Sequence, residues 1–229
     1  MQNINILVTC ANSQVFPEVS AALKSMNKFK IRLIGVDSGD NFDIAQAFAD
    51  KAYKVPSGID LKYADKLLEI CLKERVDVVL FGSDEEQLAA TEFKEKFVSC
   101  GVNLATEEKA KLDLISDKLL IIKFLESKGL RVPKYLELDD ENYKSQIQNF
   151  YSTQGKYIFK PRIGRGSKGL KLVDKATTDR QIFNQKDNFL AHNHHVIDYL
   201  QNNAKETQSW VINEYIVGEK YSSDIICEG

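Results

Sequence analysis

The sequence lacks the signatures of several large protein classes. Its cysteines are scattered and form no C-x-x-C pair, so we expect free, buried thiols in a reduced, cytoplasmic protein. They are Cys10, Cys71, Cys100 and Cys227. The N-terminus has no basic segment followed by a long apolar core, and no stretch approaches the roughly 18 apolar residues of a membrane helix. Neither a signal peptide nor a membrane anchor is indicated.

An excess of charge of one sign is also missing. The formal net charge is -2 at pH 7 and the pI is near 6.0, which argues against a broad basic surface for nucleic acid. Hydrophobic residues make up 43% of the chain and charged residues 28%, the ordinary mix of a globular protein. With 229 residues the chain is long enough for one large or two small domains, each with its own core.

The N-terminal part of the chain alternates between strand and helix patterns. Strands are predicted at 4–10, 31–37, 52–56, 77–82 and 102–106, and helices at 16–26, 41–53, 60–76 and from Ser83. We expect the strand at 77–82 to be buried on both faces, as is typical of parallel sheets. This alternation predicts an α/β fold with a doubly wound sheet over residues 1–115.

Two helices in this part carry a specific signal. The helix at 60–76 places apolar residues on one face, namely Leu61, Ala64, Leu67, Leu68, Cys71 and Leu72. The next helix begins at Ser83, and Glu86 three residues later predicts a capping box.

The second half of the chain has a different character. Residues 107–130 predict one long helical stretch that ends at Gly129, and Pro133 prevents the helix from resuming. A β-rich region follows, with strands at 156–161, 169–173 and 209–226. The polar stretch 184–208 between the last two strands predicts a helix and an exposed loop, and "HNHH" at 192–195 predicts a solvated polar loop because its spacing fits no zinc pattern.

A glycine-rich, basic segment stands at 160–173, "KPRIGRGSKGLKLV". Gly164, Gly166 and Gly169 lie among basic residues, a combination that favours a polyphosphate ligand because glycine lets backbone amides approach phosphate oxygens. The G-x-G-x-x-G spacing also occurs in the dinucleotide fingerprint, in the kinase glycine loop and in unrelated loops. The spacing alone does not decide between them.

The flanks of the glycine segment narrow the choice. A dinucleotide fold continues into a helix, but "GLKLV" at 169–173 alternates like a strand, so we predict a loop between two strands. The chain has no G-x-x-x-x-G-K-[ST] motif of a P-loop and no H-R-D or D-F-G motif of a protein kinase. A glycine-rich hairpin turn with a solvated basic face is the remaining alternative.

Four segments together resemble the ATP-grasp superfamily, specifically its carbamoyl-phosphate-synthase-like branch. They are the N-terminal pattern "ILVTCAN…IGVDSG…DKAYKVP…VDVVLFGSDEEQL", then "SDKLLIIKFLESKGLRVPKY", "YIFKPRIGRGSKGLKLV" and "WVINEYIVGEKYSSDII", in family order. The resemblance implies a pre-ATP-grasp domain at 1–115, a connecting helix at 116–133, a lid subdomain at 134–212 and the start of a C-terminal subdomain at 213–229. We therefore expect an incomplete ATP-grasp α+β domain with its lid subdomain and first hinge strand.

The resemblance also implies roles for individual residues. Lys118 and Lys160 would bind the ATP phosphates, and Gly164, Gly166, Ser167 and Gly169 would close over the β- and γ-phosphates. Glu214, Tyr215 and Ile216 would form the hinge that recognises adenine. The family usually has a ribose-binding carboxylate where this chain has Lys220, so Glu219 is the candidate replacement, although strand alternation points it to the other face. No metal ligand is expected in this chain, and the Mg²⁺ ligands are expected beyond Gly229.

The activity implied is ATP-dependent ligation, in which a carboxylate becomes an acyl phosphate that an amine or similar nucleophile attacks. The expected partners are small-molecule carboxylate and nucleophile substrates, and a homodimer is left open. Asp84 and Glu85, after a strand, are a candidate substrate corner, although the favoured explanation is that these acids stabilise the N-terminal dipole of the helix. Two other functions stay open: a nucleotide-binding module without turnover, and an NAD-dependent oxidoreductase favoured by the fold and the glycine spacing alone.

Overall fold

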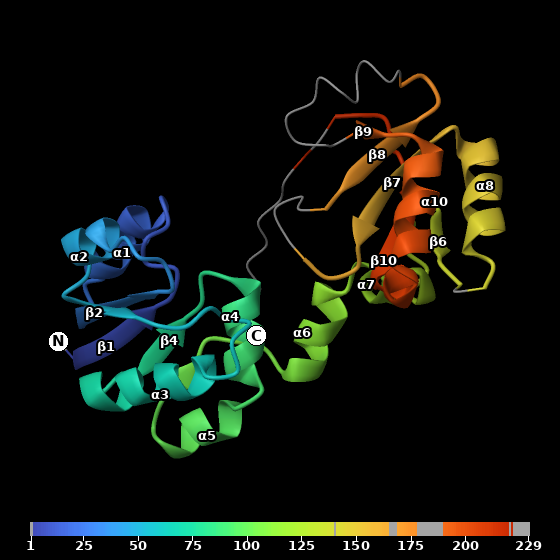
Figure 1. Ribbon diagram of the computed structural model, residues 1–229. Coiled ribbons are helices and arrows are strands. Elements are labelled where there is room, and N and C mark those ends of the chain that lie inside the picture. The colour runs from blue at the N-terminus through green and yellow to red at the C-terminus, as the bar shows by residue number, and fades with distance from the viewer. Residues whose placement is uncertain (1, 140, 165–168, 178–189, 220, 222–229) are drawn as a thin grey trace. The chain divides into compact units, whose positions relative to one another are not determined.

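The computed structural model describes residues 2–139, 141–164, 169–177, 190–219 and 221. The chain forms two compact units, Met1–Asp113 and Leu114–Gly229, referred to below as the N-terminal and C-terminal units. Each unit is built around its own five-stranded sheet (Figure 1). No helix of the described part of the chain is long and apolar enough to cross a membrane.

The N-terminal unit contains a fully parallel sheet. Its strands are β1 (Gln2–Val8), β2 (Phe29–Asp37), β3 (Lys51–Lys54), β4 (Val78–Leu80) and β5 (Asn103–Leu104). They lie in the order β3-β2-β1-β4-β5, and each neighbouring pair is parallel. The strand order reverses between β1 and β4, the point at which open α/β sheets leave a crevice at their carboxyl edge.

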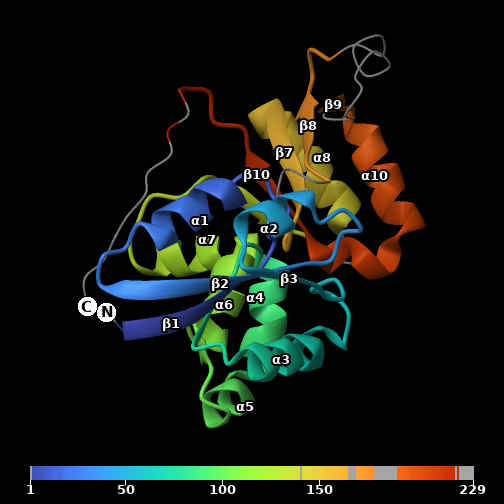
Figure 2. The ribbon, with the colours of Figure 1, turned by 90° about the vertical axis from the view of Figure 1, so that its left-hand side faces the viewer.

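Helices cover both faces of this sheet, which confirms the doubly wound prediction. Those on one face are α1 (Phe16–Lys24) and α2 (Asp43–Phe48), and those on the other are α3 (Tyr63–Glu74), α4 (Asp84–Thr91) and α5 (Lys94–Ser99). Figure 2 shows α1 and α2 above β1 and β2, with α3 and α5 below. Alternating residues of β1 serve the two cores: Ile6 packs on the α1 side and Leu7 on the α3 side.

Three predictions for this unit need correction. The helix predicted at 41–53 is only α2, because Ala49 is extended and β3 begins at Lys51. Leu61 and Leu72 are 96% and 52% exposed: α3 starts after Leu61, and Leu72 lies a further 100° round the helix from buried Cys71. Tyr63 and Ile70 occupy the core instead. The strand at 77–82 is the shorter β4, and only its central residue is buried.

The C-terminal unit contains a mixed sheet. Its strands are β6 (Tyr135–Glu137), β7 (Lys156–Pro161), β8 (Lys171–Asp174), β9 (Leu190–Ala191) and β10 (Trp210–Glu214), in the order β6-β10-β7-β8-β9. β7 is antiparallel to both β8 and β10, and β8 is parallel to β9. Two helices, α8 (Tyr143–Gln154) and α10 (Asn193–Asn202), pack on one face over a core that includes Tyr157, Phe159 and Ile212. A short 3₁₀ helix, η1 (Ala204–Ser209), precedes β10.

The long helical stretch predicted at 107–130 is two helices, α6 (Lys109–Ser116) and α7 (Lys118–Ser127). The break is at Asp117, whose extended backbone (φ -93°, ψ 110°) ends α6 and whose carboxylate caps α7. Gly129 has φ +73°, which confirms it as the residue that ends α7.

Two further expectations differ from the structure. "HNHH" is not a loop: His192 caps α10 and the other three residues begin it. No group of three His, Cys, Asp or Glu side chains suited to a metal ion occurs within the described residues. The thiol of Cys71 is buried as expected, that of Cys10 is half-buried and that of Cys100 is exposed, while Cys227 lies outside the described residues.

Candidate functional site

The sheet of the C-terminal unit has one face covered by α8 and α10 and another on which the predicted lysine lies. Tyr157 and Phe159 of β7 are 0% and 3% exposed in the helix-covered core. Because successive strand residues alternate between faces, Ile158 and Lys160 point to the opposite face. Lys160 is half-buried, one residue before the end of the strand.

Lys118 is brought to the same end of β7 by the start of α7. Its backbone N–H donates to the carbonyl oxygen of Arg162 at 2.9 Å. Its Nζ donates to the carbonyl oxygens of Arg162 at 3.2 Å and Gly164 at 2.7 Å. The side-chain amine is therefore held at the start of the glycine segment. Lys118 and Lys160, the two predicted lysines, are far apart in the sequence but lie at the same end of β7.

The two ammonium groups are close enough to influence each other. Burial, and then the positive charge of Lys118, lower the pKa of Lys160 below its usual value. Desolvation and a like charge both disfavour the protonated form of a lysine. An anion bound between the two groups would relieve both effects, so this end of β7 is electrostatically suited to phosphate oxygens.

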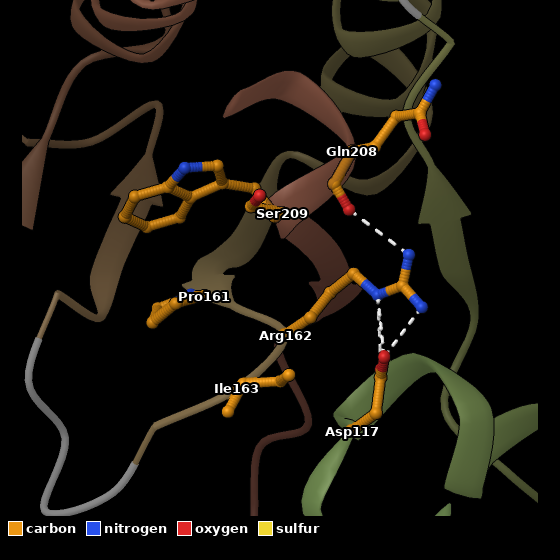
Figure 3. A pocket seen from close by; sticks show the side chains of 7 residues that line it. Asp117, Pro161, Arg162, Ile163, Gln208 and Ser209 are labelled. Carbon is orange, nitrogen blue, oxygen red and sulfur yellow. Dashed lines mark hydrogen bonds and ion pairs between the residues drawn. The ribbon is translucent and has the colours of Figure 1, made fainter. Parts of the chain in front are cut away.

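A pair of charged residues fixes this arrangement. Arg162 donates through Nε to both carboxylate oxygens of Asp117 at 3.1 Å and through Nη2 to Oδ2 at 2.6 Å (Figure 3). Asp117 also accepts the backbone N–H groups of Leu119 at 2.9 Å and Leu120 at 3.2 Å, and Arg162 Nη1 donates to the carbonyl oxygen of Gln208 at 3.1 Å. The pair thus links the first turn of α7 to the end of β7 and to η1.

Burial by itself would raise the pKa of Asp117, but hydrogen bonds from Arg162, Leu119 and Leu120 outweigh it and hold the pKa below its ordinary value. The carboxylate is therefore charged at neutral pH. The role of this pair was missed in the sequence, where Asp117 counted only as a neighbour of Lys118. Its position before an apolar helical run was the available signal for an N-cap.

A cavity of about 460 Å³ lies beside this pair (Figure 3). It is lined by Asp117, Pro161, Arg162, Ile163, Gln208, Ser209 and Trp210. Lys118 and Lys160 are not among its lining residues, so the cavity adjoins the lysine pair without containing it.

The glycine segment leaves β7 and returns as β8. The antiparallel pairing of these strands confirms the prediction that the segment joins two strands, and no helix follows Gly169 as it would in a dinucleotide fold. Gly164 has φ +131° and Gly169 has φ +75°, conformations that favour glycine. Gly166 and Ser167 lie outside the described residues.

The predicted hinge follows β10. The N–H of Glu214 donates to the carbonyl oxygen of Lys134 at 2.9 Å, and its Oε1 accepts the N–H of Lys134 at 2.9 Å. Tyr215 and Ile216 are 38% and 64% exposed. Glu219 is exposed and accepts a hydrogen bond from the Tyr221 hydroxyl. Lys220 lies outside the described residues.

Asn213 was not singled out by the sequence and stands out in the structure. It is 4% exposed, and neither Nδ2 nor Oδ1 has a hydrogen-bond partner among the described residues. It pairs with Ile158 across β10 and β7, so it belongs to the same face of the sheet as Lys160. A buried amide without partners is costly to a fold.

The candidate substrate corner belongs to the N-terminal unit. Asp84 and Glu85 occupy the first turn of α4 after the cap residue Ser83. Ser83 Oγ accepts the N–H of Glu86 at 3.3 Å and donates to Glu86 Oε2 at 3.0 Å, so the predicted cap forms with the carboxylate bound to the hydroxyl. The Cys10 thiol donates to the same oxygen at 3.1 Å, which joins β1 to α4.

Models of two known protein families match the sequence of this chain. A family model for the ATP-grasp domain matches residues 115–229, and a model for the PylC-like N-terminal domain matches residues 6–105. The chain belongs to the ATP-grasp family. The match covers the whole C-terminal part, including the lysine pair and the glycine segment. A comparison with curated protein sequences yields no match.

Solved structures of ATP-grasp enzymes share the fold. The biotin carboxylase domain dimer of Hydrogenobacter thermophilus 2-oxoglutarate carboxylase, in complex with MgADP, ADP and bicarbonate, has a TM-score of 0.63 at 15% identity over 93% of this chain and 44% of that one. An L-amino acid ligase from Bacillus licheniformis gives 0.61 at 12% identity over 94% and 45%. An N5-carboxyaminoimidazole ribonucleotide synthetase in its ADP complex gives 0.57 at 17% identity over 94% and 47%. The chain therefore spans less than half the length of these ATP-grasp proteins.

Proposed function

We propose that the C-terminal unit of this ATP-grasp protein binds ATP through Lys118 and Lys160. The observation that carries the proposal is the convergence of these two ammonium groups at the end of β7, under the start of the glycine segment. Two cations whose repulsion is already unfavourable gain most from a polyanion, and the triphosphate is the polyanion that the family handles. The segment from Gly164 to Gly169 then lies against the β- and γ-phosphates.

The base and ribose are assigned to the region around the end of β10. Tyr215 and Ile216 follow the strand and are exposed, and their backbone groups are assigned to the adenine edge. Glu214 is assigned a structural role in the hinge, because its N–H and its carboxylate are already hydrogen-bonded to the backbone of Lys134. Glu219 is the carboxylate nearest in sequence to the family's ribose-binding position. Asn213 supports a ligand at this face, since its buried amide has two unused hydrogen-bonding groups within the described residues.

For the complete protein we propose an ATP-dependent ligase. A carboxylate oxygen of the substrate attacks the γ-phosphorus of ATP, ADP leaves, and an acyl phosphate forms. An amine or similar nucleophile then attacks the acyl carbon and inorganic phosphate leaves. The lysine pair orients the phosphates and offsets the charge of the leaving ADP. Mg²⁺, when bound, supplies further counter-charge, and the described residues hold no group suited to it.

The finer parts of the proposal concern partners and boundaries. Asp84 and Glu85 are proposed to contact the acceptor substrate, which is a small carboxylate or its nucleophile. Domain limits at 115, 133 and 212 and the carbamoyl-phosphate-synthase-like branch are proposed on the resemblance. A cytoplasmic location is proposed on the scattered cysteines, which form no C-x-x-C pair, and a homodimer is proposed as well.

Calorimetric titration with ATP tests the nucleotide assignment. Lys160→Ala removes one of two phosphate contacts and should weaken ATP binding at least ~10-fold, because a charge-assisted hydrogen bond contributes about 1.5–3 kcal/mol. Lys171→Met is the matched control: it removes a lysine from the neighbouring strand on the other face and should leave ATP affinity within about twofold. Equal ATP affinity in wild type and Lys160→Ala would remove the assignment.

Hydroxylamine trapping distinguishes the ligase from a nucleotide-binding module without turnover. Incubation of the natural full-length protein with ATP, Mg²⁺ and candidate carboxylates should form a hydroxamate if an acyl phosphate accumulates. ATP binding without hydroxamate for any carboxylate would favour the module. The oxidoreductase alternative loses its main support, because a strand rather than a helix follows the glycine segment.

A further inference from the structure

The amine of Lys160 has no hydrogen-bond acceptor in the part of the chain that the structure describes. Its Nζ makes neither a hydrogen bond nor an ion pair there, although the side chain is half-buried. Buried polar groups in proteins are nearly always paired, and a lysine ammonium has three N–H donors to satisfy. The amine is therefore available to a group from outside the chain, and its chemistry depends on what lies beside it.

The neighbouring charge is that of Lys118, which is held in place. Its Nζ donates to the carbonyl oxygens of Arg162 at 3.2 Å and Gly164 at 2.7 Å, so its positive charge stays at the end of β7. Burial, and then this charge, lower the pKa of Lys160. A lysine that is desolvated and stands beside another cation is activated as a nucleophile, because more of its amine is neutral at a given pH.

We propose that Lys160 is a site of acylation by small acyl phosphates. Such a molecule joins a phosphate group, which the charge of Lys118 attracts, to an acyl carbon that a neutral amine attacks. The two lysines thus have different tasks: Lys118 holds the phosphate end of the reagent, and Lys160 attacks its acyl end.

The reaction is a simple acyl transfer. The lone pair of Lys160 Nζ attacks the acyl carbon and forms a carbon–nitrogen bond. The bond between the acyl carbon and the phosphate oxygen breaks, inorganic phosphate leaves with that electron pair, and the nitrogen releases a proton to water. The product is an amide on Lys160. The charge of Lys118 offsets the negative charge of the leaving phosphate.

Acylation of Lys160 regulates the nucleotide site, and this part of the inference rests on the proposed function. The amide has no charge, so one of the two cations proposed to bind the ATP phosphates is lost. ATP and acyl phosphates compete for the same end of β7. Bound ATP therefore protects Lys160 from acylation, and acylated protein binds ATP more weakly.

Acetyl phosphate is the probe for this site. The full chain is treated with it, without ATP or Mg²⁺, at about pH 8, which is below the usual pKa of a lysine. Peptide mass spectrometry follows the acetylated fraction of each lysine, with the exposed Lys28 and Lys62 as references. Lys160 should be acetylated at least ~5-fold faster than either reference, because the bound phosphate places the acyl carbon beside its amine.

Acetic anhydride is the matched reagent without a phosphate group. It acetylates the same amines, so it measures the reactivity of Lys160 without phosphate binding. The preference for Lys160 over Lys28 and Lys62 should fall at least ~3-fold with this reagent, because the attraction to Lys118 is lost. This comparison uses only the wild-type chain.

Lys118→Met tests the holding charge. The variant keeps an unbranched side chain, and acetyl phosphate should acetylate its Lys160 at least ~3-fold more slowly than that of the wild type. The loss should be larger with acetyl phosphate than with acetic anhydride. Circular dichroism checks that the variant is folded.

Three results would overturn the acylation site. The first is acetylation of Lys160 no faster than that of Lys28 and Lys62, and the second is an equal preference with acetic anhydride. The third is an unchanged rate with acetyl phosphate in Lys118→Met.

The nucleotide proposal fails or stands separately. Protection of Lys160 by ATP supports a shared site. Preferred acetylation that ATP does not slow would keep the acylation site and overturn its link to the nucleotide. Weaker ATP binding in Lys160→Ala, without preferred acetylation in the wild type, would keep the nucleotide site and remove the acylation site.

Discussion

The guanidinium of Arg162 binds both oxygens of the Asp117 carboxylate, and the two side chains are only 22% and 10% exposed. One partner stands just after β7 and the other caps α7, so their pairing joins two segments that are 45 residues apart. The neighbour of Asp117 is Lys118, whose amine reaches the carbonyl oxygen of Gly164. The Asp117–Arg162 pair therefore fixes the position of Lys118, one of the two residues proposed to bind phosphate.

Asp117→Ala is expected to destabilise the C-terminal unit by about 2–4 kcal/mol. The substitution removes the N-cap of α7 and leaves the mostly buried Arg162 charge without its partner. Urea unfolding followed by Trp210 fluorescence measures the loss, because the only tryptophan of the chain belongs to this unit. Asp117→Asn is the control: its amide oxygen still caps the helix, so it should lose less than the alanine variant. Equal losses would show that the cap contributes nothing beyond the charge pair.

As the pH is raised, ATP binding is expected to begin to weaken at a lower pH than it would if Lys160 had the usual pKa of a lysine. The pKa of Lys160 lies below its usual value of 10.5 in the free protein, first because of burial and then because of Lys118. Bound phosphate favours the protonated form, so a proton is taken up where the pH exceeds the lowered pKa. Below that pKa the lysine is protonated in both states, and affinity does not depend on its titration.

Calorimetry in two buffers of different ionisation enthalpy measures this uptake, at about pH 8 and about pH 9.5, above the range in which histidine titrates. Wild type should take up more protons at the higher pH. Because Lys160→Ala binds ATP weakly, the experiment uses Lys160→Arg, which retains a permanent charge and should show a smaller rise. The same rise in both proteins would assign the uptake to another group.

Gly169→Ala is expected to destabilise the C-terminal unit by about 1–2 kcal/mol. At φ +75° an alanine side chain is strained by its own backbone. Its Cβ would otherwise meet Pro161 Cδ at 3.4 Å, an ordinary contact, so the backbone conformation is the cause. Gly218→Ala is the matched control, with nothing within 4 Å and no positive φ, and should change stability by less than about 0.5 kcal/mol. The midpoint of urea unfolding, followed by Trp210 fluorescence, compares the stability of the two variants.

Cys100 is expected to react with iodoacetamide before Cys10 and Cys71. Burial raises the pKa of both to about 12, and for Cys10 the hydrogen bond to Glu86 adds to it. Because the thiolate is the nucleophile, these two thiols are nearly inert at neutral pH and become reactive only as the pH rises toward that value. Cys100 is exposed. Peptide mass spectrometry after a short reaction gives the order, and labelling of Cys10 at the rate of Cys100 would contradict it.

The pattern of the sequence was enough for the order of most elements. Apolar alternation and helical spacing predicted β1, β2, α1 and α3, because each of these elements has a local apolar periodicity that faces a core. The ends of elements were less predictable. Leu61 has the residue type expected in α3, but the turn in which Asp60 accepts the N–H groups of Lys62 and Tyr63 starts the helix after it. "HNHH" looked like a loop because its polarity outweighed the cap that His192 provides.

The sequence by itself determined which residues bear positive charge and which positions require glycine, since both are properties of single residues and short spacings. From these alone came the strand–glycine–strand segment, whereas Lys118 and Lys160 were chosen through the resemblance to the ATP-grasp superfamily. Only the tertiary structure decided that the two lysines converge, that Arg162 and Asp117 position Lys118, and that Phe159, Tyr199 and Trp210 line a cavity on the opposite face. These relationships join residues tens of positions apart, and they arise from strand register and helix packing rather than from any local pattern.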